Sequence, residues 1–170
     1  MANPLTPAQQ QEIEQLAKQA THLTWYLLGV ILLFLVVSVL LGTYGPTMAN
    51  APWWGIVLSI AAGTVGSGVA AVQSAQQRRA NGWEVNDGTK YPEDKPEDKF
   101  TEGMLPLFYT RPFLGSVVGA VFYFGAPSVF GLGASVHENP EQLAFWSFVV
   151  GVLAKTFLET LKDLFKKLGK

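Results

Sequence analysis

The chain has 170 residues, of which 49% are hydrophobic and only 15% are charged, so it departs from the usual balance of a soluble domain. Its formal net charge of -1 gives no overall basic surface, which excludes nucleic acid as an expected partner, and the lack of cysteine excludes disulfides and thiolate sites. The charges are crowded into three segments between long uncharged stretches. This pattern predicts an integral membrane protein whose first partner is the lipid bilayer.

Residues 1–22 are the first predicted element, an amphipathic helix next to the membrane. Thr6 and Gln9 have the spacing of a capping box, with Pro7 at the first helical position. Apolar side chains then recur at helical spacing as far as Ala20. We therefore expect this helix to run directly into the first membrane span.

Residues 23–72 contain the first two predicted spans. The stretches from Leu23 to Leu41 and from Trp53 to Val72 are uncharged. Each has about the 20 residues that a helix needs to cross roughly 30 Å of hydrocarbon.

Small residues crowd the second span. Those that we place at a protein contact are Ser59, Gly63, Thr64, Gly66 and Ser67. Two interpretations stay open: close packing against another helix, or the lining of a narrow aqueous path in an oligomer.

Residues 73–112 are predicted to form a polar cytoplasmic loop. This segment is rich in charge, glycine and proline, and it contains two copies of the sequence PEDK between Pro92 and Lys99. Such a composition cannot bury enough apolar surface to fold alone. The aromatic residues within it predict that part of the loop docks against the helices or against a partner.

Residues 113–158 contain the third and fourth predicted spans. The third, Phe113 to Ala134, includes the helix-packing motif formed by Gly115 and Gly119. The fourth, Leu143 to Ala154, is short enough to be re-entrant instead. If all four segments cross, all 12 Lys and Arg residues fall on one side, which the positive-inside rule assigns to the cytoplasm together with both termini.

Residues 159–170 are predicted to form a basic amphipathic helix at the end of the chain. Lys155 and Glu159 are four residues apart and can pair at the cytoplasmic boundary. This pair is either a surface helix pair or part of a charged ring at the inner mouth of a pore.

Catalysis and cofactor binding find little support in the sequence. No nucleophile with a base, carboxylate pair or metal triad is expected at one membrane depth, so we predict no enzyme and no metal site. His22 and His137 fall on opposite sides of the membrane and cannot share a metal. Each is either a weak candidate ligand to a pigment or haem, or an ordinary interfacial histidine, and no cofactor is predicted.

Two segments carry a resemblance to known proteins. The sequence RPFLGSVVGAVFY at residues 111–123, followed by FVVG at residues 148–151 and by Glu159, resembles the C-terminal half of uncharacterised bacterial small multi-pass membrane proteins. This resemblance covers under half of the chain. It implies a helical fold in a prokaryotic inner membrane and brings no assigned activity.

The sequence thus predicts an all-α membrane protein with four transmembrane helices, both termini cytoplasmic, and amphipathic helices at both ends. The function that we expect is a self-associating protein that forms an oligomeric channel or pore, with the small residues of the second span and the glycines of the third at the axis or at a helix contact. The alternative is a non-catalytic accessory or structural subunit of a larger membrane complex.

Overall fold

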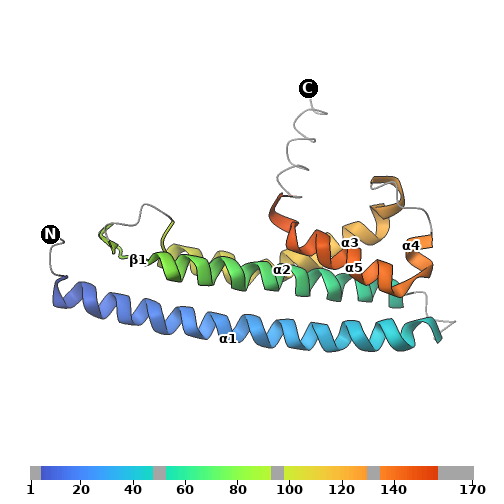
Figure 1. Ribbon diagram of the computed structural model, residues 1–170, viewed down its shortest axis with the longest axis horizontal. Helices are drawn as coiled ribbons and strands as arrows, with labels where there is room; N and C mark the ends of the chain where they lie inside the picture. The colour runs from blue at the N-terminus through green and yellow to red at the C-terminus, as the bar shows by residue number, and fades with distance from the viewer. Residues whose placement is uncertain (1–4, 48–52, 93–97, 130–134, 157–170) are drawn as a thin grey trace, which may run out of the picture.

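The computed structural model describes residues 5–47, 53–92, 98–129 and 135–156. Apart from two short strands, the described residues are mainly helical, and the elements in chain order are α1 (Pro7–Tyr44), η1 (Gly45–Thr47), α2 (Trp54–Asn81), β1 (Trp83–Glu84), β2 (Lys90–Tyr91), η2 (Glu102–Met104), α3 (Leu105–Val129), α4 (Ser135–Glu138) and α5 (Pro140–Val152). The long helices lie side by side along one direction (Figure 1). The prediction of a helical fold is confirmed.

Helix α2 is the centre of the arrangement, because it packs against α1, α3 and α5. The first half of α1, the end of α2 and the β strands lie at one end of the bundle (Figure 1). The connections from α1 to α2 and from α4 to α5 lie at the other end. We refer to these as the hairpin end and the connection end.

Three helical segments among the described residues are long and apolar enough to cross a membrane: Pro7–Tyr44, Trp54–Asn81 and Glu102–Gly125. Only 6% of the apolar window of the first is buried inside the bundle, whereas 67% of the window of α2 is buried. An exposed apolar helix with all its backbone hydrogen bonds satisfied internally suits contact with lipid. Membrane-spanning helices are therefore supported for the first three predicted spans.

The fourth predicted span corresponds to α5, which has only 13 residues. At a rise of about 1.5 Å per residue such a helix covers roughly 20 Å, less than the hydrocarbon core. Ala154 to Thr156 are also helical, and Thr156 is the last residue that the structure describes. A complete fourth crossing depends on later residues, and these, with the predicted helix at 159–170, lie outside the described residues.

The start of α1 follows the predicted capping box. The Thr6 hydroxyl accepts a hydrogen bond from the backbone N–H of Gln9, and the Gln9 side chain accepts one from the backbone N–H of Thr6. The helix then continues without interruption to Tyr44. The predicted amphipathic helix and first span are thus one continuous element.

The segment predicted as a polar loop is shorter and more ordered than expected, because α2 extends into it as far as Asn81 and α3 already begins at Leu105. Between them, β1 and β2 form an antiparallel hairpin that pairs Trp83 with Tyr91. Gly82 joins α2 to β1 with a φ of 118°, a region that favours glycine.

Polar contacts tie this hairpin to the first turns of α1. The Gln9 amide donates to the carboxylate of Asp87, and this hydrogen bond lowers the pKa of Asp87 below its ordinary value. The backbone N–H of Asn86 donates to the carboxylate of Glu12 over 2.7 Å. The hairpin therefore lies against the N-terminal part of α1.

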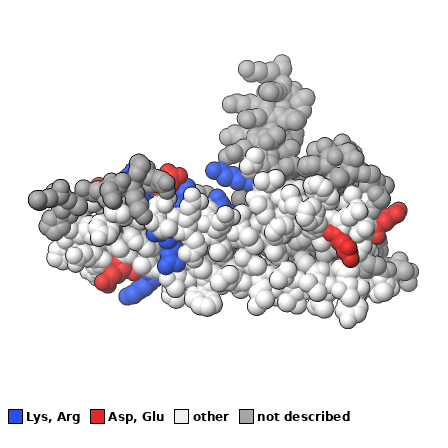
Figure 2. All heavy atoms as spheres, viewed as in Figure 1, with Lys and Arg blue, Asp and Glu red and all other residues white. Residues whose placement is uncertain are grey.

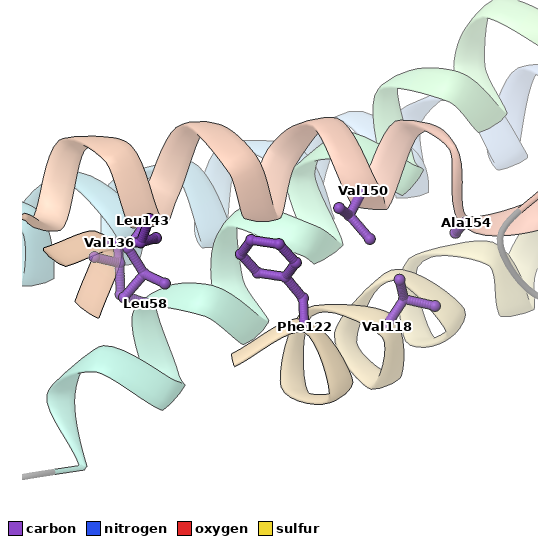
Figure 3. Close-up of a cluster of buried hydrophobic side chains, with 7 residues drawn as sticks. All are labelled: Leu58, Val118, Phe122, Val136, Leu143, Val150 and Ala154. Atoms are coloured by element: carbon purple, nitrogen blue, oxygen red, sulfur yellow. The ribbon is translucent and has the colours of Figure 1, made fainter. Parts of the chain in front are cut away.

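Two hydrophobic clusters hold the helices together. The first joins α2, α3, α4 and α5 and consists of Leu58, Val118, Phe122, Val136, Leu143, Val150 and Ala154. Within it, Val118 and Phe122 on α3 point toward α5, and Val150 on α5 points back toward α3 (Figure 3). This cluster secures α5 to the bundle despite its short length.

The second cluster explains how the hairpin segment is anchored. Phe100 is fully buried with Leu23 and Leu27 of α1, Ala71 of α2 and Phe108 of α3. Its ring stacks on Phe108 at a centroid distance of 6.0 Å. The prediction that part of this segment docks is confirmed, and it docks against helices of the same chain.

Candidate functional site

The small residues of α2 bring three helix backbones into contact around Gly63. A Cβ atom at Gly63 would lie 2.5 Å from the carbonyl oxygen of Gly115 and 3.1 Å from the Cα of Gly119, both in α3. A Cβ at Gly151 of α5 would in turn meet the backbone of Gly63. Only residues without side chains permit α3 and α5 to approach α2 this closely.

The other predicted glycines take part in the same contact. A Cβ at Gly66 would overlap with the carbonyl of Phe148 in α5, and one at Gly119 would overlap with the carbonyl of Ser59. We refer to this meeting of α2, α3 and α5 as the glycine contact.

Hydroxyl groups complete the glycine contact. The hydroxyl oxygens of Ser59 and Ser147 lie 2.5 Å apart, joining α2 to α5. Those of Thr64 and Ser116 lie 2.6 Å apart, joining α2 to α3. Hydrogen bonds of this kind add to helix association because the hydroxyls have no water to bind inside a membrane bundle.

Ser67 extends this polar line toward the hairpin end. Its hydroxyl donates to the carbonyl of Arg111 over 2.6 Å. The paired residues also give the helix directions. Moving along α2 from Ser59 to Ser67, the partners in α3 run backward from Gly119 to Arg111. Helices α2 and α3 are therefore antiparallel.

Of the two interpretations of the small-residue face, the geometry matches close packing. Ser59, Thr64 and Ser67 are buried, and the glycines beside them touch backbone atoms of α3 and α5. An aqueous path would need this face to be open. In the described part of the chain, the face is occupied by the protein's own helices.

Ser116 and Ser147 were not among the predicted contact residues. Each is a small hydroxyl residue within an otherwise apolar segment, and that is a signal for a helix contact in a membrane protein. The sequence could have suggested them, although it does not indicate which hydroxyl each would meet.

Changing Ser59 and Ser147 to alanine, separately and together, measures the hydrogen bond between α2 and α5. We expect a coupling free energy of about 0.6 kcal/mol, and at most about 1.7 kcal/mol, because such bonds contribute modestly in membrane bundles. Reversible unfolding of the four proteins in mixed detergent micelles gives the value. Strictly additive effects would mean that the two hydroxyls do not interact.

The two predicted histidines are not brought together. His22 is exposed on α1, whereas His137 lies in α4 at the connection end, where its ring packs edge-on against Tyr123 at 4.8 Å. Lys155 is exposed just after α5, and Glu159 lies outside the described residues. Among the residues that the structure describes, no group of three or more His, Asp or Glu side chains could hold a metal ion.

Comparison with known proteins does not add to this picture. No family model matches the chain, and no curated protein or solved structure is similar to it.

Proposed function

We propose that this chain is a four-span membrane protein with both termini in the cytoplasm, and that it serves without catalysis as an accessory or structural subunit of a larger membrane complex. The observation that carries this proposal is the glycine contact. Because the small residues of α2 are already used to join α2 to α3 and α5, they are not available to line an oligomeric pore.

The proposed topology is supported by the distribution of charge along the bundle. On the face seen in Figure 2, Lys and Arg side chains gather toward the hairpin end and the middle, and only acidic side chains appear at the connection end. Among the described residues, that end carries Glu138, the last residue of α4, and Glu141, in the first turn of α5, and no Lys or Arg. This is the asymmetry that the positive-inside rule associates with a cytoplasmic hairpin end. The resemblance noted above suggests a prokaryotic inner membrane.

The surface proposed for the partner is the outer face of α1. Trp25 and Leu32 are 70% and 64% exposed, and a Cβ at Gly29 between them would meet nothing within 4 Å. A glycine flanked by large apolar side chains forms a notch into which another helix can pack closely. Lipid covers this face in the absence of a partner.

The other candidate, a self-associating channel, is not favoured by a specific contact. It would need a conducting path at some surface other than the glycine contact, because the described interior between α2, α3 and α5 is filled by backbone and hydroxyl groups. This alternative can be tested as self-association through the outer face of α1.

Native mass spectrometry of the assembly extracted gently from its own membrane distinguishes the two functions. We expect one copy of the 18.5 kDa chain bound to other proteins. Changing Gly29 to leucine should weaken recovery of those partners, because the notch on α1 is filled. The matched change of Gly103, which also meets nothing within 4 Å but lies outside α1, should not. A closed ring of identical subunits would contradict the accessory role and support a pore.

A further inference from the structure

A cavity of about 520 Å³ lies beside the last residues of α5, between α2 and α3. It lies where α5 has ended at Val152, near the level of Gly66, whereas α2 continues to Asn81. Over the last turns of α2, the groove between α2 and α3 is therefore not covered by the described part of α5. Along α2 its described lining runs from Ser67 to Arg78, and the helix ends at Asn81.

Three basic side chains from three different helical segments line this cavity. Arg78 comes from α2, Arg111 from α3 and Lys155 from the residues that follow α5. No Asp or Glu is among the described residues that line it. Arg78 and Arg111 are close enough to repel each other, and the Asp98 carboxylate that pairs with Arg78 is not among the described residues of the lining.

The protein supplies hydrogen-bond acceptors for only some of the guanidinium nitrogens of the two arginines. The Arg111 guanidinium lies over the ring of Phe108 at 5.3 Å and donates a long hydrogen bond of 3.4 Å to the carbonyl of Ala70. Nη2 of Arg78 binds the carboxylate of Asp98 at 3.0 Å, whereas its Nη1 is buried without a hydrogen-bond partner in the described part of the chain. A buried guanidinium nitrogen without an acceptor is costly, and an anion in the cavity would supply one.

The rest of the cavity wall is apolar. Leu107, Leu114 and Val152 belong to its lining and are exposed. Cations and exposed aliphatic side chains around one cavity match a molecule that has a phosphate head and hydrocarbon tails. Basic pockets between helices at the cytoplasmic side of membrane proteins recognise such headgroups.

We propose that this cavity binds the phosphate group of an anionic phospholipid, with Arg78, Arg111 and Lys155 as its cationic contacts. The inference depends on the chain being embedded in a membrane and does not depend on its role as an accessory subunit. A free phosphate shares the same chemistry at the cations. A free phosphate has no hydrocarbon to place against the apolar wall. For this reason we assign the site to a lipid.

The test uses the full-length protein in nanodiscs of phosphatidylcholine with and without phosphatidylglycerol. Native mass spectrometry after gentle release counts the phosphatidylglycerol molecules that stay bound. The cavity variant combines Arg78→Gln, Arg111→Gln and Lys155→Gln. The matched control combines Lys18→Gln, Arg79→Gln and Lys90→Gln, which removes the same charge from residues that do not line the cavity.

We expect each removed cation to weaken phosphatidylglycerol binding about fivefold, and the triple variant to weaken it by on the order of a hundredfold. The control should bind as the unchanged protein does. Lys155→Gln alone changes one exposed side chain of the lining, and it should show the fivefold loss. Circular dichroism verifies the helical content of every variant.

Two results would overturn the proposal. Equal retention of phosphatidylglycerol by the cavity variant and the control would show that the lipid binds elsewhere on the basic end. Displacement of the lipid by inorganic phosphate, added to the nanodiscs at constant ionic strength, would assign the cavity to a soluble phosphate compound. Retention that survives inorganic phosphate and is lost in the cavity variant supports the lipid site.

Discussion

Replacing Gly63 by alanine is expected to destabilise the bundle by about 3 kcal/mol, at the upper end of the usual range for overpacking. The new methyl group would meet the backbone of Gly115 and Gly119, which cannot rotate away as a side chain can. Helix α3 would have to move outward, which would also stretch the hydrogen bond between Thr64 and Ser116. Reversible unfolding in mixed detergent micelles, followed by circular dichroism, measures this loss.

The matched control is Gly29→Ala in α1. A Cβ at Gly29 would meet nothing within 4 Å, so the substitution adds a better helix former without a clash. Its free energy of unfolding should stay the same or rise by less than about 1 kcal/mol. If Gly63→Ala and Gly29→Ala had equal effects, the close approach of α2, α3 and α5 would not describe the protein in its membrane.

Replacing Phe100 by alanine is expected to release the hairpin segment from the helices. Its ring is fully buried in the second cluster, and removing a buried phenylalanine typically costs about 3–5 kcal/mol. This loss of stability acts on a short segment. Its two strands have only two residues each and pair with one another. We expect faster hydrogen exchange and cleavage by protease between residues 82 and 104, while the long helices remain folded.

Tyr91→Ala is the control for this change, because Tyr91 lies in the same hairpin with 46% of its surface exposed. It should leave hydrogen exchange in the segment almost unchanged. Protection in the Phe100 variant equal to that in the Tyr91 variant would mean that Phe100 does not anchor the segment.

Local sequence patterns were sufficient for the long helices. The capping box at Thr6 and the uncharged stretch from Leu23 to Leu41 both depend on residues close together in the chain, and both appear in α1 as expected. The segment between α2 and α3 was harder, because its charge and proline content predict a solvated loop. Its aromatic residues predict that part of it docks, and Phe100 does so because the chain brings Phe108 and Leu23 beside it.

The grouping of basic residues around the cavity was not predicted from the sequence. Arg111 was expected in a polar loop, yet it lies in α3 at the level of Ser67. Its position next to Arg78 depends on how α3 is placed along α2, and no pattern within either helix contains that information. The sequence indicated the basic residues and not their convergence.

By itself, the sequence determined that the chain is helical, that it contains apolar segments long enough to cross a membrane, and that small residues on its second span lie at a protein contact, either helix packing or the lining of an aqueous path. Each of these follows from composition and spacing within one segment, because it depends on residues that are close together in the sequence. Only the tertiary structure decided that α3 and α5 of the same chain occupy that contact, that α5 stops near Gly66, and that three basic side chains meet beside its end. These outcomes depend on the relative positions of whole helices, which are set by backbone contacts between residues far apart in the sequence.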